Sequence, residues 1–217
     1  MTGINKMLVA GVDEAGKGPV LGPMIVAGVV MEENKLPELQ LLGVKDSKVL
    51  SPTRRNYLSA KIKEIAADYY ILEISAAQID EMRKIMTMNQ LMVVAHTKVL
   101  ENLRPDRAYL DAADVLEERF GMNVKKKYDG TIDVISKHKA DTTFPIVAAA
   151  SILAKVQRDR IIRDMEKEMG MILGSGYPSD PKTRKFLEGW MKSHEVLPDI
   201  ARHSWKTSEN LLEKLRL

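Results

Sequence analysis

A glycine-rich turn separates two apolar runs near the start of the chain. The runs, at residues 7–12 and 24–31, are rich in β-branched residues and are broken by Gly and Pro. They are therefore predicted to be two strands of a sheet, joined by the turn GVDEAGKGPVLGP at residues 11–23. The turn contains two acids, Asp13 and Glu14, directly where the first strand ends. These acids are the first candidates for chemistry.

The first part of the turn matches the pattern G-x-x-x-x-G-K of a phosphate-binding loop. The match fails because position 18 is Gly, where Ser or Thr would bind Mg²⁺, and because Pro19 opposes the helix that should follow. The two acids would also lie inside the anion cradle, where like charges about 4 Å apart repel by roughly 4 kcal/mol at an effective dielectric near 20. We therefore reject a nucleotide-binding loop.

A divalent cation would turn the two acids from an obstacle to phosphate binding into metal ligands. Paired carboxylates at a strand end, here Asp13 and Glu14, are hard oxygen ligands suited to Mg²⁺ or Mn²⁺. Gly16 and Gly18 leave backbone N–H groups uncovered, so a nucleic-acid strand can approach the main chain, and Lys17 adds a charge for phosphate. On this segment alone, a solvent-exposed hairpin with incidental acids stays open as the alternative.

The rest of the chain has the pattern of an α/β protein. Helices are predicted at residues 53–66, 89–103 and 145–169, and further strands at residues 69–75, 106–111 and 133–141. Residues 181–217 are predicted to form one or two helices that contain both tryptophans. We predict a main domain over residues 1–180 and a C-terminal helical segment over residues 181–217, packed on it.

Two of the predicted strands end in an aspartate. Asp111 ends an apolar strand, where a buried carboxylate is costly unless it is paired or bound to a metal. Asp141 precedes the long helix, and its ordinary role there would be a helix cap. Three strand ends that each carry an acid are explained more simply by one metal cluster than by coincidence. We therefore predict that Asp13, Glu14, Asp111 and Asp141 converge.

Composition argues against other kinds of chemistry. The chain of 217 residues contains no cysteine, which excludes disulfides, thiolate zinc sites and cysteine nucleophiles. Its four histidines form no H-x-x-x-H pair and no serine lies in a G-x-S-x-G elbow; His96 is predicted to be a packed or surface residue.

A net charge of +3 allows a polyanionic partner without requiring one. Without a leader sequence or a run of about 18 apolar residues, we expect a cytoplasmic protein with no membrane contact.

Five sequence blocks, in order from about residue 8 to residue 180, resemble the type 2 ribonucleases H, and most of all the single-chain archaeal members. The blocks are DEAGKGPVLGPM, GVKDSKVLS, YLDAAD, KAD leading to VAAASILAKVQRDR, and GSGYPSDP. The resemblance implies a ribonuclease-H-like fold, with a five-stranded mixed sheet flanked by helices and a C-terminal helical segment. The family's metal-binding acids correspond here to Asp13, Glu14, Asp111 and Asp141.

The resemblance also implies a set of substrate contacts. The family's Gly-Arg-Gly turn, whose backbone reads the ribose 2′-hydroxyl, corresponds to Gly16, Lys17 and Gly18, with Lys in place of the commoner Arg. The tyrosine that packs on the sugar beside the RNA–DNA junction corresponds to Tyr177. Further contacts to the substrate backbone are implied for Lys45, Ser47, Lys48, Ser151 and Lys155.

The implied activity is hydrolysis of RNA in RNA–DNA hybrids and cutting on the 5′ side of ribonucleotides in duplex DNA. The cut leaves a 3′-hydroxyl and a 5′-phosphate; two Mg²⁺ or Mn²⁺ ions roughly 3.5 to 4 Å apart activate water, and the 2′-hydroxyl marks the site. The rivals are another metal-dependent nuclease of the same broad fold that acts on DNA, and a hybrid-binding protein without activity. Because the tail SENLLEKLRL lacks paired aromatics, we predict a monomer.

Overall fold

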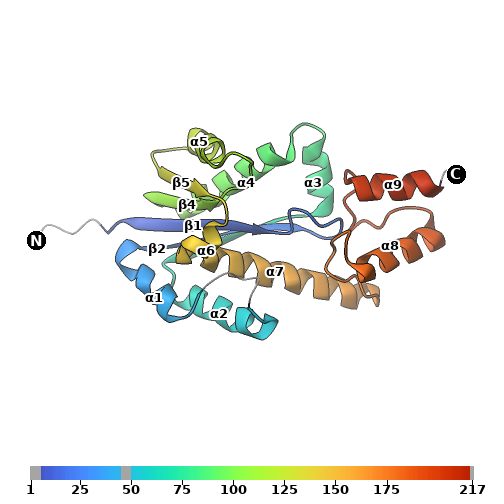
Figure 1. Cartoon of the computed structure of the whole chain (residues 1–217), viewed down its shortest axis with the longest axis horizontal. Coiled ribbons are helices and arrows are strands. Elements are labelled where there is room, and N and C mark those ends of the chain that lie inside the picture. Colours follow the sequence, from blue (N-terminus) through green and yellow to red (C-terminus); the bar gives the residue numbers. More distant parts are fainter. Residues whose placement is uncertain (1–5, 45–49, 216–217) are drawn as a thin grey trace, which may run out of the picture. The chain divides into compact units, whose positions relative to one another are not determined.

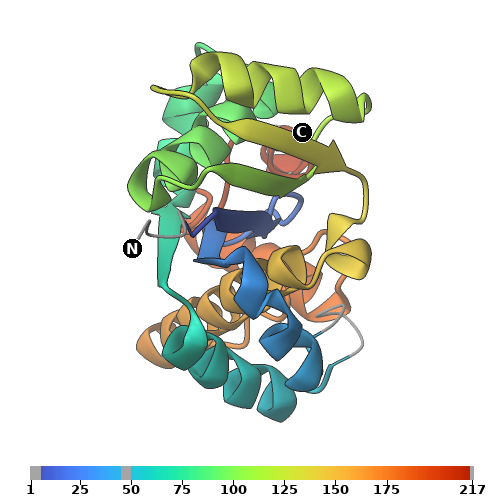
Figure 2. The same cartoon turned by 90° about the vertical axis from the view of Figure 1, so that its left-hand side faces the viewer.

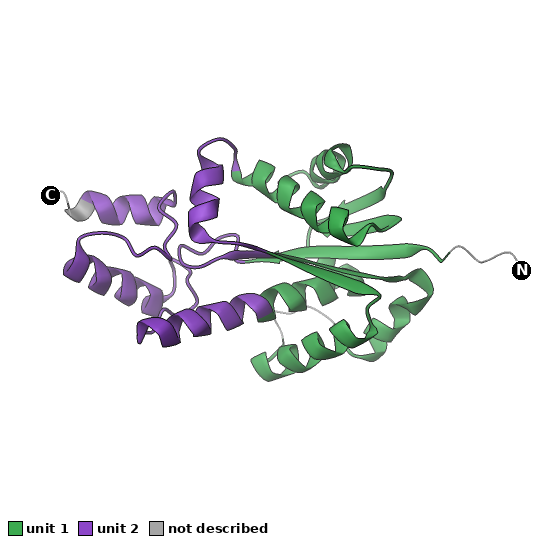
Figure 3. Ribbon diagram, turned by 180° about the vertical axis from the view of Figure 1, so that it is seen from behind, with its two compact units in different colours: residues 1–15, 26–72, 88–156 green, residues 16–25, 73–87, 157–217 purple. Residues whose placement is uncertain are grey.

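The computed structural model describes residues 6–44 and 50–215 and divides the chain into two compact units (Figure 3). The first unit consists of residues 1–15, 26–72 and 88–156, and the second of residues 16–25, 73–87 and 157–217. Each unit therefore combines segments that are far apart in the sequence. The predicted division at residue 180 stays a prediction.

A five-stranded sheet forms the centre of the fold, in the order β3-β2-β1-β4-β5 (Figure 1). The strands are β1 (Leu8–Ala15), β2 (Met24–Glu32), β3 (Asp68–Ile74), β4 (Arg107–Asp111) and β5 (Asp133–Lys137). Strand β1 pairs parallel with β4, and β4 pairs parallel with β5. The predicted five-stranded mixed sheet is confirmed. Since β2 follows the glycine-rich turn, the helix that a phosphate-binding loop requires is not formed.

The helices of the first unit lie on both faces of this sheet (Figures 1 and 2). They include α1 (Leu36–Leu41), α2 (Pro52–Ile65), α4 (Met88–Leu103), α5 (Glu117–Lys127), α6 (Ala140–Thr143) and the start of α7 (Pro145–Met169), with a short 3₁₀ turn, η1, at Glu33–Lys35. Helices α4 and α5 lie on one face, and α2 and α7 on the other. The predicted helices at residues 53–66, 89–103 and 145–169 agree with α2, α4 and α7 to within one residue at each end.

Two glycines in the central strands let helices approach the sheet closely. A Cβ atom at Gly11 in β1 would overlap the backbone of Ile146 and Val147 at the start of α7. A Cβ atom at Gly28 in β2 would overlap the side chain of Val99 in α4. A side chain at either position would push the helix away from the sheet. The absent Cβ at Gly11 therefore fixes how closely α7 lies along β1.

The structure corrects one predicted strand. Residues 133–141 do not form a single strand, because β5 ends at Lys137 and Asp141 lies in the short helix α6. The reason is local: Lys139 adopts the left-handed conformation, with φ of 54°, which ends the extended chain and serves as the N-cap position of α6. The alternation of polar and apolar residues in this segment continues past the strand and does not reveal the turn.

The second unit has its own apolar core and three complete helices. The helices are α3 (Ala76–Arg83), α8 (Pro181–His194) and α9 (Lys206–Leu215). Its core includes Leu21, Leu173, Phe186 and Leu187, with Trp190 and Trp205 packed against it. The C-terminal region thus forms two helices, as predicted, but Trp205 lies just before α9. No helix in the described part of the chain is long and apolar enough to cross a membrane.

Candidate active site

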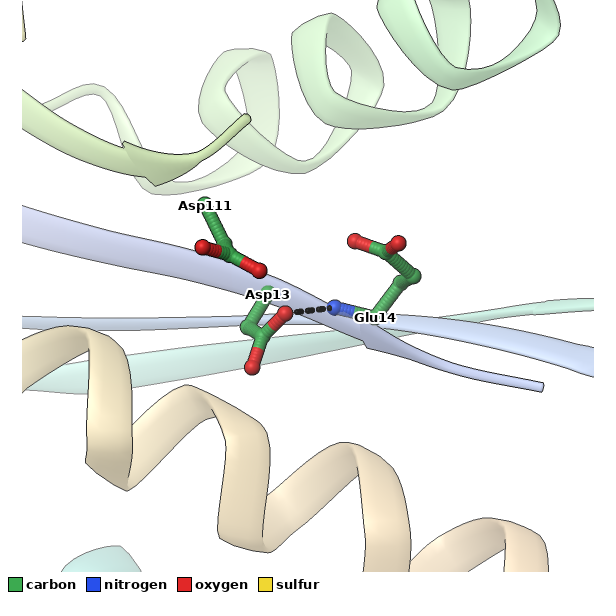
Figure 4. A group of neighbouring side chains, drawn as sticks. All are labelled: Asp13, Glu14 and Asp111. Atoms are coloured by element: carbon green, nitrogen blue, oxygen red, sulfur yellow. Dashed lines mark hydrogen bonds between the residues drawn. The ribbon is translucent and has the colours of Figure 1, made fainter. Parts of the chain in front are cut away.

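Two parallel strands bring three carboxylates together in the first unit (Figure 4). Strand β1 carries Asp13 and Glu14 near its end, and the neighbouring strand β4 ends at Asp111. The register pairs Val12 with Leu110, so Asp13 and Asp111 follow at the same level of the sheet. One oxygen atom from each of the three carboxylates lies within 4.8 Å of the other two. This spacing allows the three side chains to share one cation.

Asp13 is the buried member of this group, with only 4% of its surface exposed. Burial raises the pKa of Asp13 well above its ordinary value, and the charges of Glu14 and Asp111 raise it further. Hydrogen bonds from the side chain of Ser151 and from the Glu14 N–H, which lies 2.7 Å from Asp13 Oδ1, act in the opposite direction and lower that pKa. A buried carboxylate beside two others requires either a proton or a cation.

This donor set fits a divalent cation. Carboxylate oxygens are the ligands that Mg²⁺ and Mn²⁺ prefer, and a positive ion removes the repulsion that raises the pKa of Asp13. Two hydrogen-bond donors also orient Asp13, namely the side chain of Ser151 on α7 and the backbone N–H of Glu14.

His96 lies beside this cluster, which the sequence did not reveal. The side chain is fully buried in α4, with Nδ1 3.0 Å from the carbonyl oxygen of Met92 and the ring edge-on to Phe120. Its Nε2 atom lies 4.0 Å from Oε2 of Glu14. Of the two predicted environments, packed or at the surface, His96 has the packed one, and this packing brings the imidazole next to a metal-ligand candidate. Only the contact between α4 and β1 creates this proximity.

The fourth predicted ligand, Asp141, does not belong to the group of three. It is buried, with 3% of its surface exposed, and lies in the first turn of α6. The preceding residue, Ala140, donates its N–H to Oδ1 of Asp111 over 2.8 Å, which ties α6 to the end of β4. Membership of Asp141 in the metal site stays a prediction.

The part of the glycine-rich turn at residues 16–22, called the glycine loop from here on, lies beside Tyr177 in the second unit. Gly16 has φ of 88°, and a Cβ atom there would lie 2.8 Å from the carbonyl oxygen of Pro23 and would overlap Arg158. Gly18 is exposed, and its Cβ position lies 3.5 Å from the ring of Tyr177, which is 41% exposed. Glycine is therefore required at position 16 by geometry, whereas at position 18 it keeps the backbone uncovered beside the tyrosine.

The other predicted substrate contacts have different environments. Lys17 is partly exposed in the glycine loop. Ser151 is buried and bonded to Asp13, and Lys155, one helical turn further along α7, is partly buried. Residues Lys45, Ser47 and Lys48 lie outside the described residues. Contact of these residues with substrate stays a prediction.

Sequence reasoning missed two buried arginines in the second unit. Arg158 and Arg202 are 2% and 0% exposed, although arginine is almost never fully buried unless it is paired. Both donate hydrogen bonds to backbone carbonyls of the segment at residues 16–22. No pattern in the sequence could identify them, because their partners are far away along the chain.

Comparison with known proteins agrees with this geometry. The family model described as Ribonuclease HII matches residues 10–208. Ribonuclease HII of Methanosarcina barkeri is 54% identical to this chain, and the match covers 97% of each. The crystal structure of the ribonuclease H2 from Pyrococcus horikoshii OT3 superimposes with a TM-score of 0.91 at 42% identity, covering 97% of this chain and 99% of that one. The structure of the PCNA:RNase HII complex from Archaeoglobus fulgidus gives a TM-score of 0.85 at 40% identity, covering 92% and 96%.

Proposed function

The chain belongs to the ribonuclease HII family and is a ribonuclease H, and we propose that it cuts duplex nucleic acid on the 5′ side of a ribonucleotide. The proposed substrates are RNA–DNA hybrids and duplex DNA that contains single ribonucleotides. The proposed products carry a 3′-hydroxyl and a 5′-phosphate. The observation that carries the proposal is the cluster of Asp13, Glu14 and Asp111, with ligand oxygens within 4.8 Å of one another.

In this proposal the carboxylates hold Mg²⁺ or Mn²⁺, and Asp141 completes the ligand set. When bound, the metal supplies an activated water and offsets the charge on the phosphate. Asp13 is held in place by the Glu14 N–H and by Ser151, so its oxygens are positioned before the ion arrives. No histidine is required as a base, and His96 is packed against Phe120 behind Glu14.

Recognition of the ribose is assigned to the second unit. Exposed Gly18 offers a backbone that no side chain covers, and Tyr177 presents a partly exposed ring beside it. Backbone groups that contact the 2′-hydroxyl distinguish RNA from DNA without reading the base. Lys17 supplies a positive charge for a phosphate of the same strand. The closeness of Gly18 and Tyr177 supports this assignment.

Assembly and location are part of the proposal. We propose a cytoplasmic monomer. The relative from Archaeoglobus fulgidus was solved in a complex with PCNA, so PCNA is the first protein partner to test, by gel filtration of an equimolar mixture. Co-elution would show that this protein binds PCNA, as the relative does. Separate elution would show that it does not bind PCNA under these conditions, and the proposed monomer would stand.

The decisive experiment maps the cut in a duplex that carries one ribonucleotide, with Mg²⁺ and Mn²⁺ compared. The expected result is one cut on the 5′ side of the ribonucleotide and an intact all-DNA duplex of the same sequence. Cutting of both duplexes would favour a DNA nuclease of the same broad fold. Binding of an RNA–DNA hybrid without cutting in either metal would favour an inactive binding protein.

A further inference from the structure

Arg202 holds the glycine loop by its carbonyl oxygens. The guanidinium is fully buried, and each of its three nitrogens donates a hydrogen bond to a different backbone carbonyl. Nη2 lies 2.6 Å from Gly16 O, Nη1 lies 3.0 Å from Lys17 O, and Nε lies 3.1 Å from Gly22 O. A planar fork with fixed donor directions determines the orientation of the accepting peptide groups.

Trp205 extends this set of bonds to the next residue of the loop. Its indole Nε1 donates to Gly18 O over 3.1 Å, and its ring lies 4.8 Å from the guanidinium carbon of Arg202. The carbonyls of residues 16, 17 and 18 are therefore all held by two side chains from the segment that precedes α9. Three consecutive carbonyls held in this way leave the loop little freedom to rotate.

The direction of the carbonyls decides the direction of the amides. A peptide group is planar and trans, so its N–H points away from its C=O. When Lys17 O is bonded to the buried Arg202, the N–H of Gly18 is directed to the opposite side. Gly18 is exposed, so this side is the one that a substrate can reach. Arg202 thus acts on the face of the loop that recognition would use, without itself being exposed.

Arg158 connects the same loop to the turn that carries Tyr177. Its Nη2 lies 3.2 Å from Leu21 O and 3.1 Å from Ser175 O, and its guanidinium lies 5.9 Å from the Tyr177 ring. Burial, and then the charge of Arg158, lowers the pKa of Arg202 to about 9, so Arg202 remains charged at neutral pH.

We propose that Arg202 and Trp205 are positioning residues that set the peptide orientation of residues 16–18 for ribose recognition, and that Arg158 holds Tyr177 in register with them. The inference rests on the proposed function of the glycine loop. It also assigns a role to the segment before α9, which supplies both of the side chains that bind the carbonyls of residues 16–18. Two buried positive charges behind the loop further favour the approach of a phosphate backbone.

The test compares Trp205→Phe with a matched control, Trp190→Phe. Both tryptophans pack on the same apolar cluster. The substitution at position 205 removes the N–H that bonds Gly18 O, whereas Nε1 of Trp190 has no hydrogen-bond partner among the residues that the structure describes. For the duplex with one ribonucleotide, we expect KM to rise about 3- to 10-fold in Trp205→Phe with kcat little changed. Trp190→Phe should keep the KM of the unaltered protein.

A second variant, Arg202→Lys, keeps the positive charge but loses the planar fork. We expect a rise in KM of about 100-fold, because three charge-assisted bonds are disturbed together. Should this variant fail to fold, Trp205→Phe still decides the question. The thermal shift caused by Mn²⁺ is measured in every variant and is expected to stay as in the unaltered protein, because the carboxylates belong to the other unit.

The outcomes separate the inference from the function on which it rests. If the unaltered protein does not cut at the ribonucleotide, the proposed function fails. If it does cut, and Trp205→Phe has an unchanged KM, the positioning role is wrong. Equal rises in KM for Trp205→Phe and Trp190→Phe would also overturn it, since they would indicate a general packing effect.

Discussion

The carboxylate cluster and the glycine loop differ in how their negative groups are balanced. In the cluster, Asp13 is buried beside two other acids, and its pKa is raised because ionisation there is unfavourable. In the loop, the carbonyls of Gly16, Lys17 and Gly18 all accept hydrogen bonds from buried or partly buried side chains. The first region requires a proton or a cation to offset its negative charges, whereas the carbonyls of the second are hydrogen-bonded within the protein itself.

This contrast indicates a division of tasks. Carboxylates that repel one another are stabilised by a bound cation, because the cation offsets their negative charges. A loop with fixed carbonyls loses little conformational entropy when substrate binds, which favours selectivity. Variants in the carboxylate cluster and in the glycine loop should therefore have different effects on cleavage and on stability.

The largest effect is expected for Asp13→Asn. Loss of this ligand should lower cleavage by more than about 100-fold, beyond what is typical of residues that only support a ligand. The same change should raise the melting temperature of the metal-free protein at neutral pH, because burial opposes ionisation of the Asp13 carboxyl and asparagine does not ionise. The exposed aspartate variant Asp129→Asn is the control and should change neither quantity.

The stability difference between Asp13→Asn and the unaltered protein should depend on pH. Because the native pKa of Asp13 is raised, the native state binds the proton more tightly, and stability falls as pH rises through that pKa. The stability gained in Asp13→Asn should therefore disappear at acid pH. Thermal melts of metal-free protein across a pH series check this, and a constant difference between the two proteins would contradict it.

A smaller effect is expected from alanine in the glycine loop, and it should differ between two positions. Gly16→Ala should destabilise the protein by about 1–3 kcal/mol, because φ is 88° and the added Cβ meets Pro23 O. Gly18→Ala should change stability by about 0.5 kcal/mol or less, yet lower ribonucleotide cleavage about tenfold by covering the backbone. Chemical denaturation and cleavage assays measure the two quantities. Equal destabilisation by both variants would refute the distinction.

Lys17→Arg tests how the side chain at position 17 binds a phosphate. Arginine can bond a phosphate with two parallel N–H groups, so the affinity for a ribonucleotide duplex should rise, but by no more than about fivefold at this partly exposed position. The charge is unchanged, so the slope of affinity against salt concentration should stay the same. For comparison, Lys17→Ala should reduce that slope by about one. Fluorescence anisotropy at several salt concentrations provides the measurement.

The smallest effect on cleavage at neutral pH is expected for Asp180→Asn. Hydrogen bonds from Ser175 and from the N–H of Lys182 lower the pKa of Asp180 from 3.8 to about 2, and they hold the turn around Tyr177. Their stabilisation is present above the unfolded pKa and is lost as pH falls from 3.8 towards 2. Urea denaturation between these pH values should show a steeper loss for the unaltered protein than for the variant. If the stability of both proteins fell equally with pH, Asp180 would not stabilise the turn through its ionised carboxylate.

Local patterns predicted most of the secondary structure near the site. The strand, turn and strand at the N-terminus, the helix at Pro145–Met169 and the strand that ends at Asp111 follow from apolar periodicity and from Gly and Pro. The short helix that contains Asp141 was not predicted, because it depends on Lys139 in the left-handed conformation and on a bond from Ala140 to Asp111. Helix α5 was also missed.

The sequence by itself determined which chemical groups are available: acids at three predicted strand ends, a glycine-rich turn that lacks the residues of a phosphate-binding loop, and no cysteine. The tertiary structure alone decided which of these groups meet. Parallel pairing of β1 with β4 brings Asp111 to Asp13, and Arg202 reaches a carbonyl 186 residues earlier in the chain. Periodicity reports only on neighbours along the chain, whereas burial of a charge or a carbonyl is set by partners that the fold supplies.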